Sequence, residues 1–440
     1  MRFVSAGFFA LVVGCSGKAD EAPTWDDVAP IFEESCTTCH QEGGIGTFAM
    51  ETYKGTTPYA AQIKQEVADR TMPPWLVTDD GSCQEYEAST TLTDEEIQTI
   101  SDWVDAGVPE GTQYAKLVPA PPPSLDRRDI SFQTPLFEPI PEGILFAEKD
   151  EYRCFAWVNP TEEDVFITGF EVEPGNEAIV HHVIGMPVDP YGLSGTGETT
   201  NGEEIATLDG SDGRLGWGCK VGAGGKVKER GMPVTWAPGQ GGVEFPEGSG
   251  FRLEADDIIV FQVHYNLADP RNLGGSDTSE IFLRIEDQVE SEAYMAMPDP
   301  FLDSMGAFPN SESLPPGEEA TTFTWEMSVP ELLDTAWLYD HDGIETVTVH
   351  SVAPHMHELG TELELTFIRE AGDEECGAEV LAWDFNWQFL YFYTTPVTLT
   401  MADRVRVKCT YDTSDVDLPT LPGWSTKNEM CLAGMYVTTN

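Results

Sequence analysis

Five residues near the N-terminus have types and spacing suited to redox chemistry. The segment Cys36-Thr37-Thr38-Cys39-His40 places two thiols three positions apart, with a histidine directly after the second. Thiols at this spacing can add to the two vinyl groups of a haem, and the following histidine then reaches the iron as the proximal ligand. A redox disulfide or half of a zinc site would not need that histidine. We therefore predict a covalently bound haem c held by Cys36, Cys39 and His40.

A second axial ligand for such a haem is expected downstream, and Met72 is the candidate. It lies in the segment TMPPW at 71–75, where two prolines restrict the backbone. A methionine that only fills the core is the alternative, but the prolines favour a held position. We predict that the Met72 thioether completes the haem site. Residues 22–113 resemble the small class I cytochrome c fold, which passes single electrons.

Five further histidines fall into three groups, His181 with His182, His264 alone, and His355 with His357. Residues two apart on a strand share a face, so His355 and His357 can bind one ion. The adjacent His181 and His182 can do so only at a bulge or a strand end. Imidazoles suit zinc, copper or iron, whereas a thioether such as that of Met430 selects Cu(I). Taken singly, each histidine could equally be a hydrogen-bonded side chain and Met430 a core residue, and zinc at one cluster stays open.

The order of these groups resembles that of the type II copper, ascorbate-dependent monooxygenases, the family of peptidylglycine α-hydroxylating and dopamine β-monooxygenases. The resemblance covers about residues 130–440 and consists of HH at 181–182, QVHY at 262–265, HMHELG at 355–360 and EMC at 429–431. It implies two copper ions that face each other across a cleft. The electron-transfer copper would be held by His181, His182 and His264, and the O₂-binding catalytic copper by His355, His357 and Met430. His341 and His350 match no ligand position.

The resemblance also implies disulfides. The family joins the cysteine of a Cys-x-Tyr strand to the cysteine after the ligand methionine, which here means Cys409 with Cys431. Cys154 with Cys219 is the second implied pair. Cys83 and Cys376 remain, either as a third bridge or as free thiols.

Three positions limit the substrate that the resemblance implies. Peptide-amidating members bind a peptide carboxylate with an Arg, an Asn and a Tyr, and the matching positions here are Ala353, Leu432 and Gly434. The loss of the arginine removes a charge-assisted pair. We therefore expect a small organic substrate other than a glycine-extended peptide.

The activity implied is hydroxylation of a C–H bond with O₂. The haem would pass electrons to the copper at His181, His182 and His264 from an upstream donor, either an ascorbate-like reductant or a redox protein. The alternative from another class is a non-catalytic periplasmic electron carrier or copper-binding protein that kept the ligands.

The N-terminal segment and the net charge limit the cellular location and the partners that we expect for this protein. An apolar run from Phe3 to Val13 follows a positive start and precedes Gly14-Cys15, which is typical of an export signal with lipidation at Cys15. The predicted location is the periplasm, or the outer membrane or cell surface as a lipoprotein, with membrane contact only through the lipid. The formal charge of −54 excludes nucleic acid as a partner and favours salty surroundings.

These residues must be positioned by a multidomain fold. Helices are expected after the caps Thr24 and Thr93, the latter ending at Gly107. Beyond the Pro-rich stretch at 117–123, we expect strands. The candidate segments are Ile258 to Tyr265, Ile344 to Val349 and the alternating aromatic residues from Trp383 to Tyr393. We predict a small all-α cytochrome c domain followed by two β-sandwich, jelly-roll-like domains. The boundaries are 1–21 for the signal and tether, 22–113 for the cytochrome domain, 114–127 for the linker, and 128–290 and 291–440 for the sandwiches.

Overall fold

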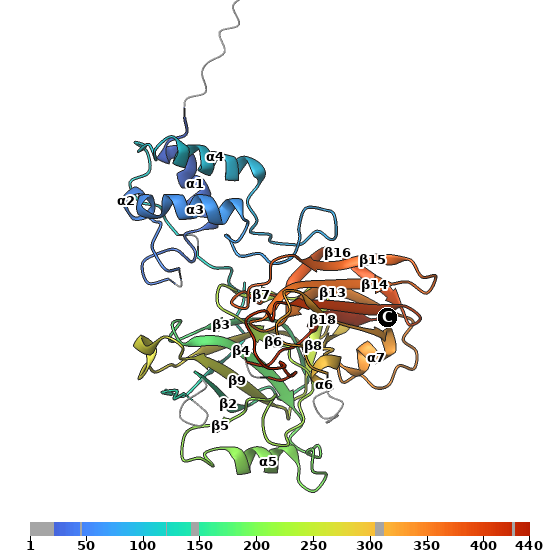
Figure 1. Ribbon diagram of the computed structural model, residues 1–440. Coiled ribbons are helices and arrows are strands. Elements are labelled where there is room, and N and C mark those ends of the chain that lie inside the picture. Colours follow the sequence, from blue (N-terminus) through green and yellow to red (C-terminus); the bar gives the residue numbers. More distant parts are fainter. Residues whose placement is uncertain (1–21, 45, 120, 142–148, 304–311, 425–426) are drawn as a thin grey trace, which may run out of the picture.

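The computed structural model describes residues 22–44, 46–119, 121–141, 149–303, 312–424 and 427–440. The expected export signal and Cys15 lie outside the described residues. Figure 1 shows a small helical unit at one end of a larger β body. Among the described residues, no helix is both long and apolar enough to cross a membrane.

The helical unit is formed by four short α-helices around a common core. Its helices are α1 (Trp25–Ser35), α2 (Tyr53–Thr56), α3 (Ala60–Ala68) and α4 (Asp94–Asp105), with the 3-10 turn η1 (Thr57–Tyr59) between α2 and α3. The expected caps are confirmed, because Thr24 and Thr93 each form a capping box at α1 and α4. Trp103 packs against Trp25 and Phe32 with ring centroids 5.9 Å apart. The sequence reasoning did not identify α2 and α3.

Three sheets form the β body. A nine-stranded sheet has the order β1-β10-β3-β8-β11-β18-β13-β16, with β7 paired to β3. A five-stranded sheet has the order β5-β2-β9-β4-β6, and a four-stranded sheet has the order β12-β17-β14-β15. The strands are β1 (Ile130–Gln133), β2 (Asp150–Val158), β3 (Val165–Glu173), β4 (Val180–Val188), β5 (Trp217–Gly218), β6 (Val234–Trp236), β7 (Val243–Glu244), β8 (Ser249–Leu253), β9 (Ile258–Asn266), β10 (Glu280–Glu286), β11 (Ser291–Ala296), β12 (Thr321–Ser328), β13 (Thr346–His355), β14 (Gly360–Ile368), β15 (Glu374–Val380), β16 (Tyr391–Thr400), β17 (Arg404–Tyr411) and β18 (Leu432–Thr439).

The long sheet is shared by two sandwiches. Its β1-β10-β3-β8 half encloses a core with the five-stranded sheet, and its β11-β18-β13-β16 half encloses another with the four-stranded sheet. The halves meet where β8 pairs with β11 in parallel, through Ser249 with Ser291 and Gly250 with Glu292. The short helices α5 (Asn201–Leu208), α6 (Pro300–Asp303) and α7 (Val329–Asp334) and the turn η3 (Pro270–Asn272) lie between strands. The chain is therefore mostly β with a small helical part, and the expected change of sandwich near residue 290 falls between β10 and β11.

The aromatic strand expected from Trp383 to Tyr393 is wrong over most of its length. Strand β16 begins only at Tyr391, and residues 381–390 form a loop. The Asp384 carboxylate accepts a hydrogen bond from the Asn386 backbone N–H at 2.9 Å, and the Trp383 indole donates to the His357 carbonyl at 3.0 Å. Asx turns of this kind compete with strand pairing. Alternation alone did not reveal the turn.

One segment of the helical unit packs on the C-terminal sandwich. The chain between α3 and α4 forms a bridge from Val77 to Val380 and another from Tyr86 to Tyr393. A disulfide between Cys83 and Cys376 closes this contact. The helical unit is therefore attached both covalently and by backbone hydrogen bonds, in addition to the linker.

Two more disulfides lie within the β body. They are Cys154–Cys219 and Cys409–Cys431, the pairs that the family resemblance implies. Cys36 and Cys39 are free thiols. Three disulfides are typical of proteins exported to an oxidising compartment.

Candidate metal centre

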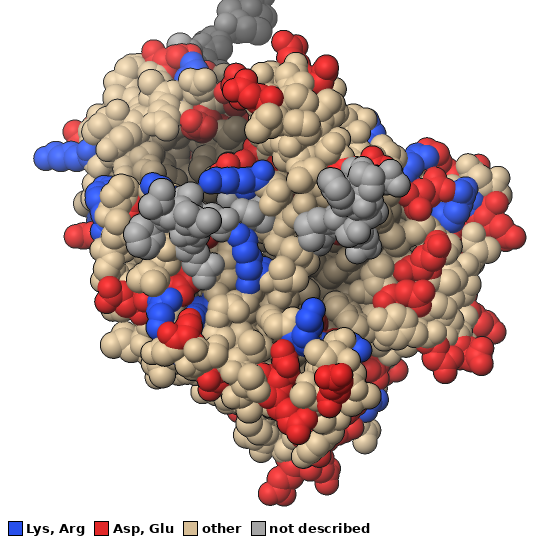
Figure 2. Space-filling model, turned by 60° about the horizontal axis from the view of Figure 1, so that its bottom comes forward, with Lys and Arg blue, Asp and Glu red and all other residues tan. Residues whose placement is uncertain are grey.

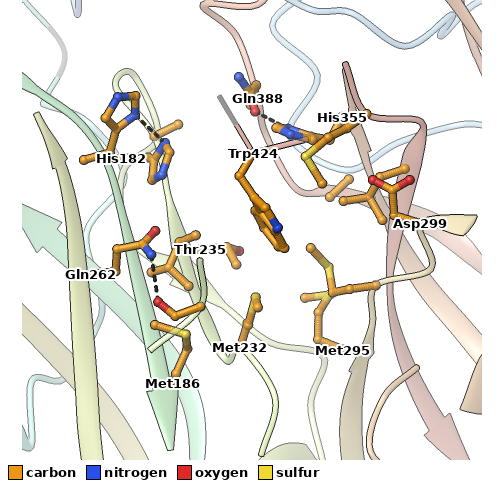
Figure 3. Close-up of a pocket in the computed structure, with 18 of the residues that line it drawn as sticks. His182, Met186, Met232, Thr235, Gln262, Met295, Asp299, His355, Gln388 and Trp424 are labelled. Atoms are coloured by element: carbon orange, nitrogen blue, oxygen red, sulfur yellow. Dashed lines mark hydrogen bonds between the residues drawn. The ribbon is translucent and has the colours of Figure 1, made fainter. Parts of the chain in front are cut away.

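A single cleft of about 480 Å³ between the two sandwiches brings the candidate ligands together. Figure 3 shows His182 and His355 on opposite walls, with the Trp424 ring between them. The candidate ligands that line this cleft are His181, His182, His264, His355, His357 and Met430.

The first wall carries the three-histidine group. His181 and His182 lie on β4, and His264 lies on the neighbouring β9. The pairing of β4 with β9 shifts register between Val180 and His182, which is the bulge that a shared ion requires of adjacent residues. The bulge lets both imidazoles turn toward His264.

The three imidazoles converge through the same ring nitrogen. The Nδ1 atom of His182 lies 3.4 Å from Nδ1 of His181 and 3.3 Å from Nδ1 of His264. A metal ion bound about 2.0 Å from each nitrogen requires ligand atoms roughly 3.3 Å apart. One donor atom from each of the three histidines lies within 4.8 Å of the others. This geometry fits a single ion with three imidazole ligands.

Neighbouring groups fix His264 and keep the cluster neutral. Its Nε2–H donates to the Asp150 carboxylate at 3.0 Å, so its Nδ1 is the nitrogen turned to the cluster. The Tyr152 ring stacks on His264 with centroids 4.1 Å apart. Burial lowers the pKa of His181, and it holds the pKa values of His182 and His264 well below the usual range. Neutral imidazole is the form that binds metals.

The opposite wall carries His355, His357 and Met430. His355 is the last residue of β13, His357 follows it outside the strand, and Met430 lies just before β18. The His355 and His357 ring centroids are 5.3 Å apart at 87°. The prediction that both lie on the strand is therefore wrong for His357, although both rings reach the cleft.

The buried carboxylate of Glu429 ties two of these ligands together. It accepts backbone hydrogen bonds from His357 at 2.8 Å and from Met430 at 3.4 Å. Burial raises the pKa of Glu429 to about 7. The Tyr411 hydroxyl donates to the Met430 carbonyl at 2.7 Å, and the Cys409–Cys431 disulfide closes the same turn. Met430 is therefore held beside His357.

Hydrogen bonds orient both imidazoles of this group. Nδ1 of His355 lies 2.6 Å from the Gln388 side-chain oxygen, and Nδ1 of His357 lies 3.0 Å from the Asn428 carbonyl. A ring N–H donated to such an oxygen leaves Nε2 as the metal-binding atom. Two imidazoles and one thioether form a donor set suited to Cu(I).

Phe385 contacts both ligand groups, and sequence reasoning did not identify it as a site residue. Its ring stacks on His181 with centroids 5.3 Å apart and meets His357 edge-on at 5.9 Å. The two imidazoles are therefore no farther apart than the sum of these distances. The alternating aromatic residues from Trp383 to Tyr393 were the only local signal for this position, and such alternation predicts a strand and not a loop at the cleft.

The candidate haem ligands lie in the helical unit. Cys36 is the C-cap of α1, and Cys39 and His40 follow it. Nδ1 of His40 lies 3.0 Å from the Phe48 carbonyl, which leaves Nε2 for a metal. Burial raises the pKa of the Cys36 thiol to about 12. Two unpaired thiols and an oriented imidazole fit covalent haem attachment.

Met72 stands apart from α3, at the start of the segment that packs on the C-terminal sandwich. Its backbone N–H donates to the Glu66 carbonyl at 3.3 Å, and its side chain is half-buried. Burial raises the pKa of the Cys39 thiol, and the Glu177 carboxylate raises it further.

The two remaining histidines form ordinary hydrogen bonds. His350 Nε2 lies 2.9 Å from the Thr438 hydroxyl, and His341 Nε2 lies 2.9 Å from the Leu338 carbonyl. Ala353 and Leu432, at two of the positions that bind a peptide carboxylate in amidating enzymes, line the cleft.

Two mouse proteins with related names are similar to parts of this chain. "DBH-like monooxygenase protein 2" of Mus musculus is 27% identical over 263 residues, which is 58% of this chain and 38% of that protein. "DBH-like monooxygenase protein 1" of Mus musculus is 31% identical over 87 residues, or 20% of this chain and 14% of that protein. The chain therefore spans less than half the length of either relative.

The likeness to solved structures is slight. A secreted protein of Parabacteroides distasonis aligns with 71% of this chain and 88% of its own length, at 5% sequence identity and a TM-score of 0.18.

The family model of the copper type II ascorbate-dependent monooxygenase C-terminal domain matches residues 305–438. That stretch contains His355, His357 and Met430, so the match to the family model includes the thioether side of the cleft.

Proposed function

We propose that this protein is a copper-dependent monooxygenase that hydroxylates a C–H bond of a small organic substrate with O₂. One observation supports this above all: two donor sets of different chemistry line one cleft. His181, His182 and His264 would hold the electron-transfer copper. His355, His357 and Met430 would hold the copper of the O₂ chemistry, and the family similarity of residues 305–438 supports this second set. Bound copper would supply the one-electron chemistry that activates O₂.

The chain's own contribution is to position and to shield. Asp150, Gln388 and the Asn428 carbonyl set the ring orientations of three of the ligand histidines. The Glu429 carboxylate and the Cys409–Cys431 disulfide hold Met430 in place. A substrate between the two walls would lie within reach of both ligand sets and would displace water from the cleft.

The lining of the cleft favours a substrate with a largely apolar body. Methionine and tryptophan side chains supply much of the lining besides the candidate ligands, and thioethers adapt to irregular apolar shapes. The residues concerned are Met186, Met232, Met295, Met297, Trp236, Trp337 and Trp424. Because Ala353 and Leu432 stand at the peptide-carboxylate positions, a glycine-extended peptide is not the expected substrate.

The helical unit, residues 22–113, is proposed to carry one haem c and to supply the electrons. Cys36 and Cys39 would form the thioethers, and His40 and Met72 the axial ligands. An upstream reductant, either ascorbate-like or a redox protein, would reduce the haem. Export and lipidation at Cys15 would place the protein in the periplasm or at the cell surface.

Oxygen consumption coupled to product formation tests this proposal. The copper-loaded protein is given reductant, O₂ and a panel of phenyl compounds and amines, and the hydroxylated product is quantified against O₂ uptake. Equal amounts of product and O₂ consumed are expected, and both should be lost in His355→Ala. Copper-loaded protein that cycles electrons without product would instead be a carrier, and zinc in place of copper would overturn the proposal.

Substitution of the proximal haem ligand tests the electron supply. In His40→Ala, reduction of copper by the upstream donor should slow, while turnover driven directly by ascorbate should continue. Unchanged donor-driven reduction would argue against the haem as the source of electrons.

A further inference from the structure

The segment that follows Met72 runs from the helical unit to the C-terminal sandwich. It leaves the helices at Met72 and reaches the C-terminal sandwich within a few residues. The Leu76 backbone N–H donates to the Tyr391 hydroxyl at 3.2 Å, and the Cys83–Cys376 disulfide closes the contact. The segment is therefore held in one position against β15 and β16.

Three aromatic rings form a continuous line along this contact. The Trp75 ring meets Tyr391 edge-on with centroids 4.9 Å apart, and Tyr391 meets Phe389 at 6.2 Å. Both separations lie in the range of direct ring contact. Tyr391 is 1% exposed, and Phe389 lines the cleft. Ring contacts thus run from three positions after Met72 to the cleft wall.

The loop that ends this line touches both ligand sets. Gln388, adjacent to Phe389, accepts from Nδ1 of His355 at 2.6 Å. Phe385, earlier in the same loop, stacks on His181 at 5.3 Å. An electron that reaches this loop has a short path to either site.

The choice of tryptophan at position 75 is not explained by packing alone. Its indole Nε1 is buried and has no hydrogen-bond partner among the described residues. A buried tryptophan normally satisfies that N–H, and an unsatisfied one costs free energy that a phenylalanine or leucine would avoid. A large π system at this place is consistent with an electronic role.

We propose that Trp75, Tyr391 and Phe389 carry electrons from the haem module into the copper cleft. This inference rests on the proposed function. Each transfer moves one electron, so haem iron(II) becomes iron(III) and copper(II) becomes copper(I), while the rings are not oxidised and no proton moves. Tunnelling rates fall steeply with distance, and the disulfide holds the segment that carries Trp75 against the sandwich. The three residues are positioning residues for electron transfer.

Flash reduction of the haem in the copper-loaded full chain tests this inference. A photoreductant reduces the haem, and haem absorbance then reports its reoxidation. In the unsubstituted protein, a fast reoxidation phase should require copper. In Trp75→Leu and in Phe389→Leu this phase should slow by about tenfold or more, because leucine breaks the ring contact. Trp75→Phe keeps a ring and should restore most of the rate.

Tyr86→Leu is the matched control. Tyr86 lies in the same docked segment and contacts Trp75 at 6.4 Å and Tyr391 at 6.0 Å, but the shorter direct contact of Trp75 with Tyr391 does not pass through it. The rate of haem reoxidation in Tyr86→Leu should stay near that of the unsubstituted protein. The haem spectrum and reduction potential should be unchanged in all variants. Equal rates in Trp75→Leu and Tyr86→Leu would overturn the inference and favour entry near Cys39 and Glu177.

The outcome separates this inference from the proposed function. Ascorbate-driven hydroxylation by Trp75→Leu should persist, since that reductant bypasses the haem. Hydroxylation without any copper-dependent haem reoxidation would overturn the relay and leave the monooxygenase. Copper-dependent haem reoxidation without hydroxylation would support electron transfer through the three rings and would overturn the proposed monooxygenase function.

Discussion

At the scale of single residues, the candidate ligands were predicted from the sequence, whereas the residues that orient them were not. The family resemblance singled out His181, His182 and His264, and motif spacing singled out the candidate haem attachment residues. Asp150, Gln388 and Phe385 act through contacts with residues that lie 114, 33 and 204 positions away. No local pattern marks such partners, because they are set by how the strands pair.

Met430→Leu should remove Cu(I) affinity at one site while leaving the fold intact. Leucine preserves apolar volume but lacks the thioether that soft copper prefers. Competition with a Cu(I) chelator should show one bound copper fewer per chain. Met435→Leu, at a buried methionine of β18 outside the cleft, is the control and should keep full copper content. Unchanged Cu(I) binding in Met430→Leu would rule the thioether out as a ligand.

Asp150→Ala should weaken metal binding at the three-histidine group. The carboxylate holds the His264 ring by a 3.0 Å hydrogen bond, and loss of such a partner typically lowers metal affinity about 10–100-fold. Titration with a copper indicator measures this loss, and the site at His355 provides the internal reference. Equal loss at both sites would indicate general damage instead of a local effect.

At the scale of elements, sequence rules worked where local chemistry decides the structure. The cap residues Thr24 and Thr93 predicted α1 and α4, and the bulge needed between Val180 and His182 is present. The aromatic run failed because the turn at Asp384 overrides its strand-like alternation. Helix α3 has a weaker apolar pattern and was missed.

The Cys409–Cys431 disulfide should stabilise the link between β17 and the start of β18, which lie in different sheets, and position Met430. It closes a loop of 22 residues, for which chain entropy gives about 3 kcal/mol. The double variant Cys409→Ala/Cys431→Ala should lose about that free energy of unfolding in denaturant titration. Its Cu(I) affinity should also fall at the site that contains Met430 and stay unchanged at the site that contains His264. Intact stability and intact copper affinity together would contradict this role.

At the scale of the whole molecule, the docking of the helical unit was the feature least accessible to sequence. Its only signal was a pair of leftover cysteines, Cys83 and Cys376, which are 293 positions apart and form a disulfide. The strand pairing around them involves single bridges too short to leave a pattern. Long-range contacts of this kind depend on the assembled surface of both units.

Cys83→Ser/Cys376→Ser should loosen the attachment without unfolding the β body. Limited proteolysis within residues 73–92 should become faster, because only backbone pairing and aromatic packing then hold the segment. Circular dichroism of the β body should be unchanged. Cleavage at the original rate would mean that the disulfide adds nothing to docking.

Salt should stabilise the whole molecule. With a formal charge of −54, carboxylates repel one another over the surface, and Figure 2 shows them spread widely over one face. Salt screens this repulsion, so Tm should rise with NaCl concentration at neutral pH. Calorimetric Tm values in NaCl are compared with values in an uncharged osmolyte. The osmolyte stabilises only by its exclusion from the protein surface, so an additional rise of Tm in NaCl reports charge screening. A Tm that falls with salt would contradict a repulsion-limited fold.

Two separate copper sites with different donors are proposed to share one cleft. Metal quantification combined with the EPR spectrum of the oxidised protein measures both sites at once. Two type II copper ions and one low-spin haem per chain are expected, with one copper signal lost in Met430→Leu. A protein that binds zinc, or a single copper that survives both Met430→Leu and His264→Ala, would contradict this proposal.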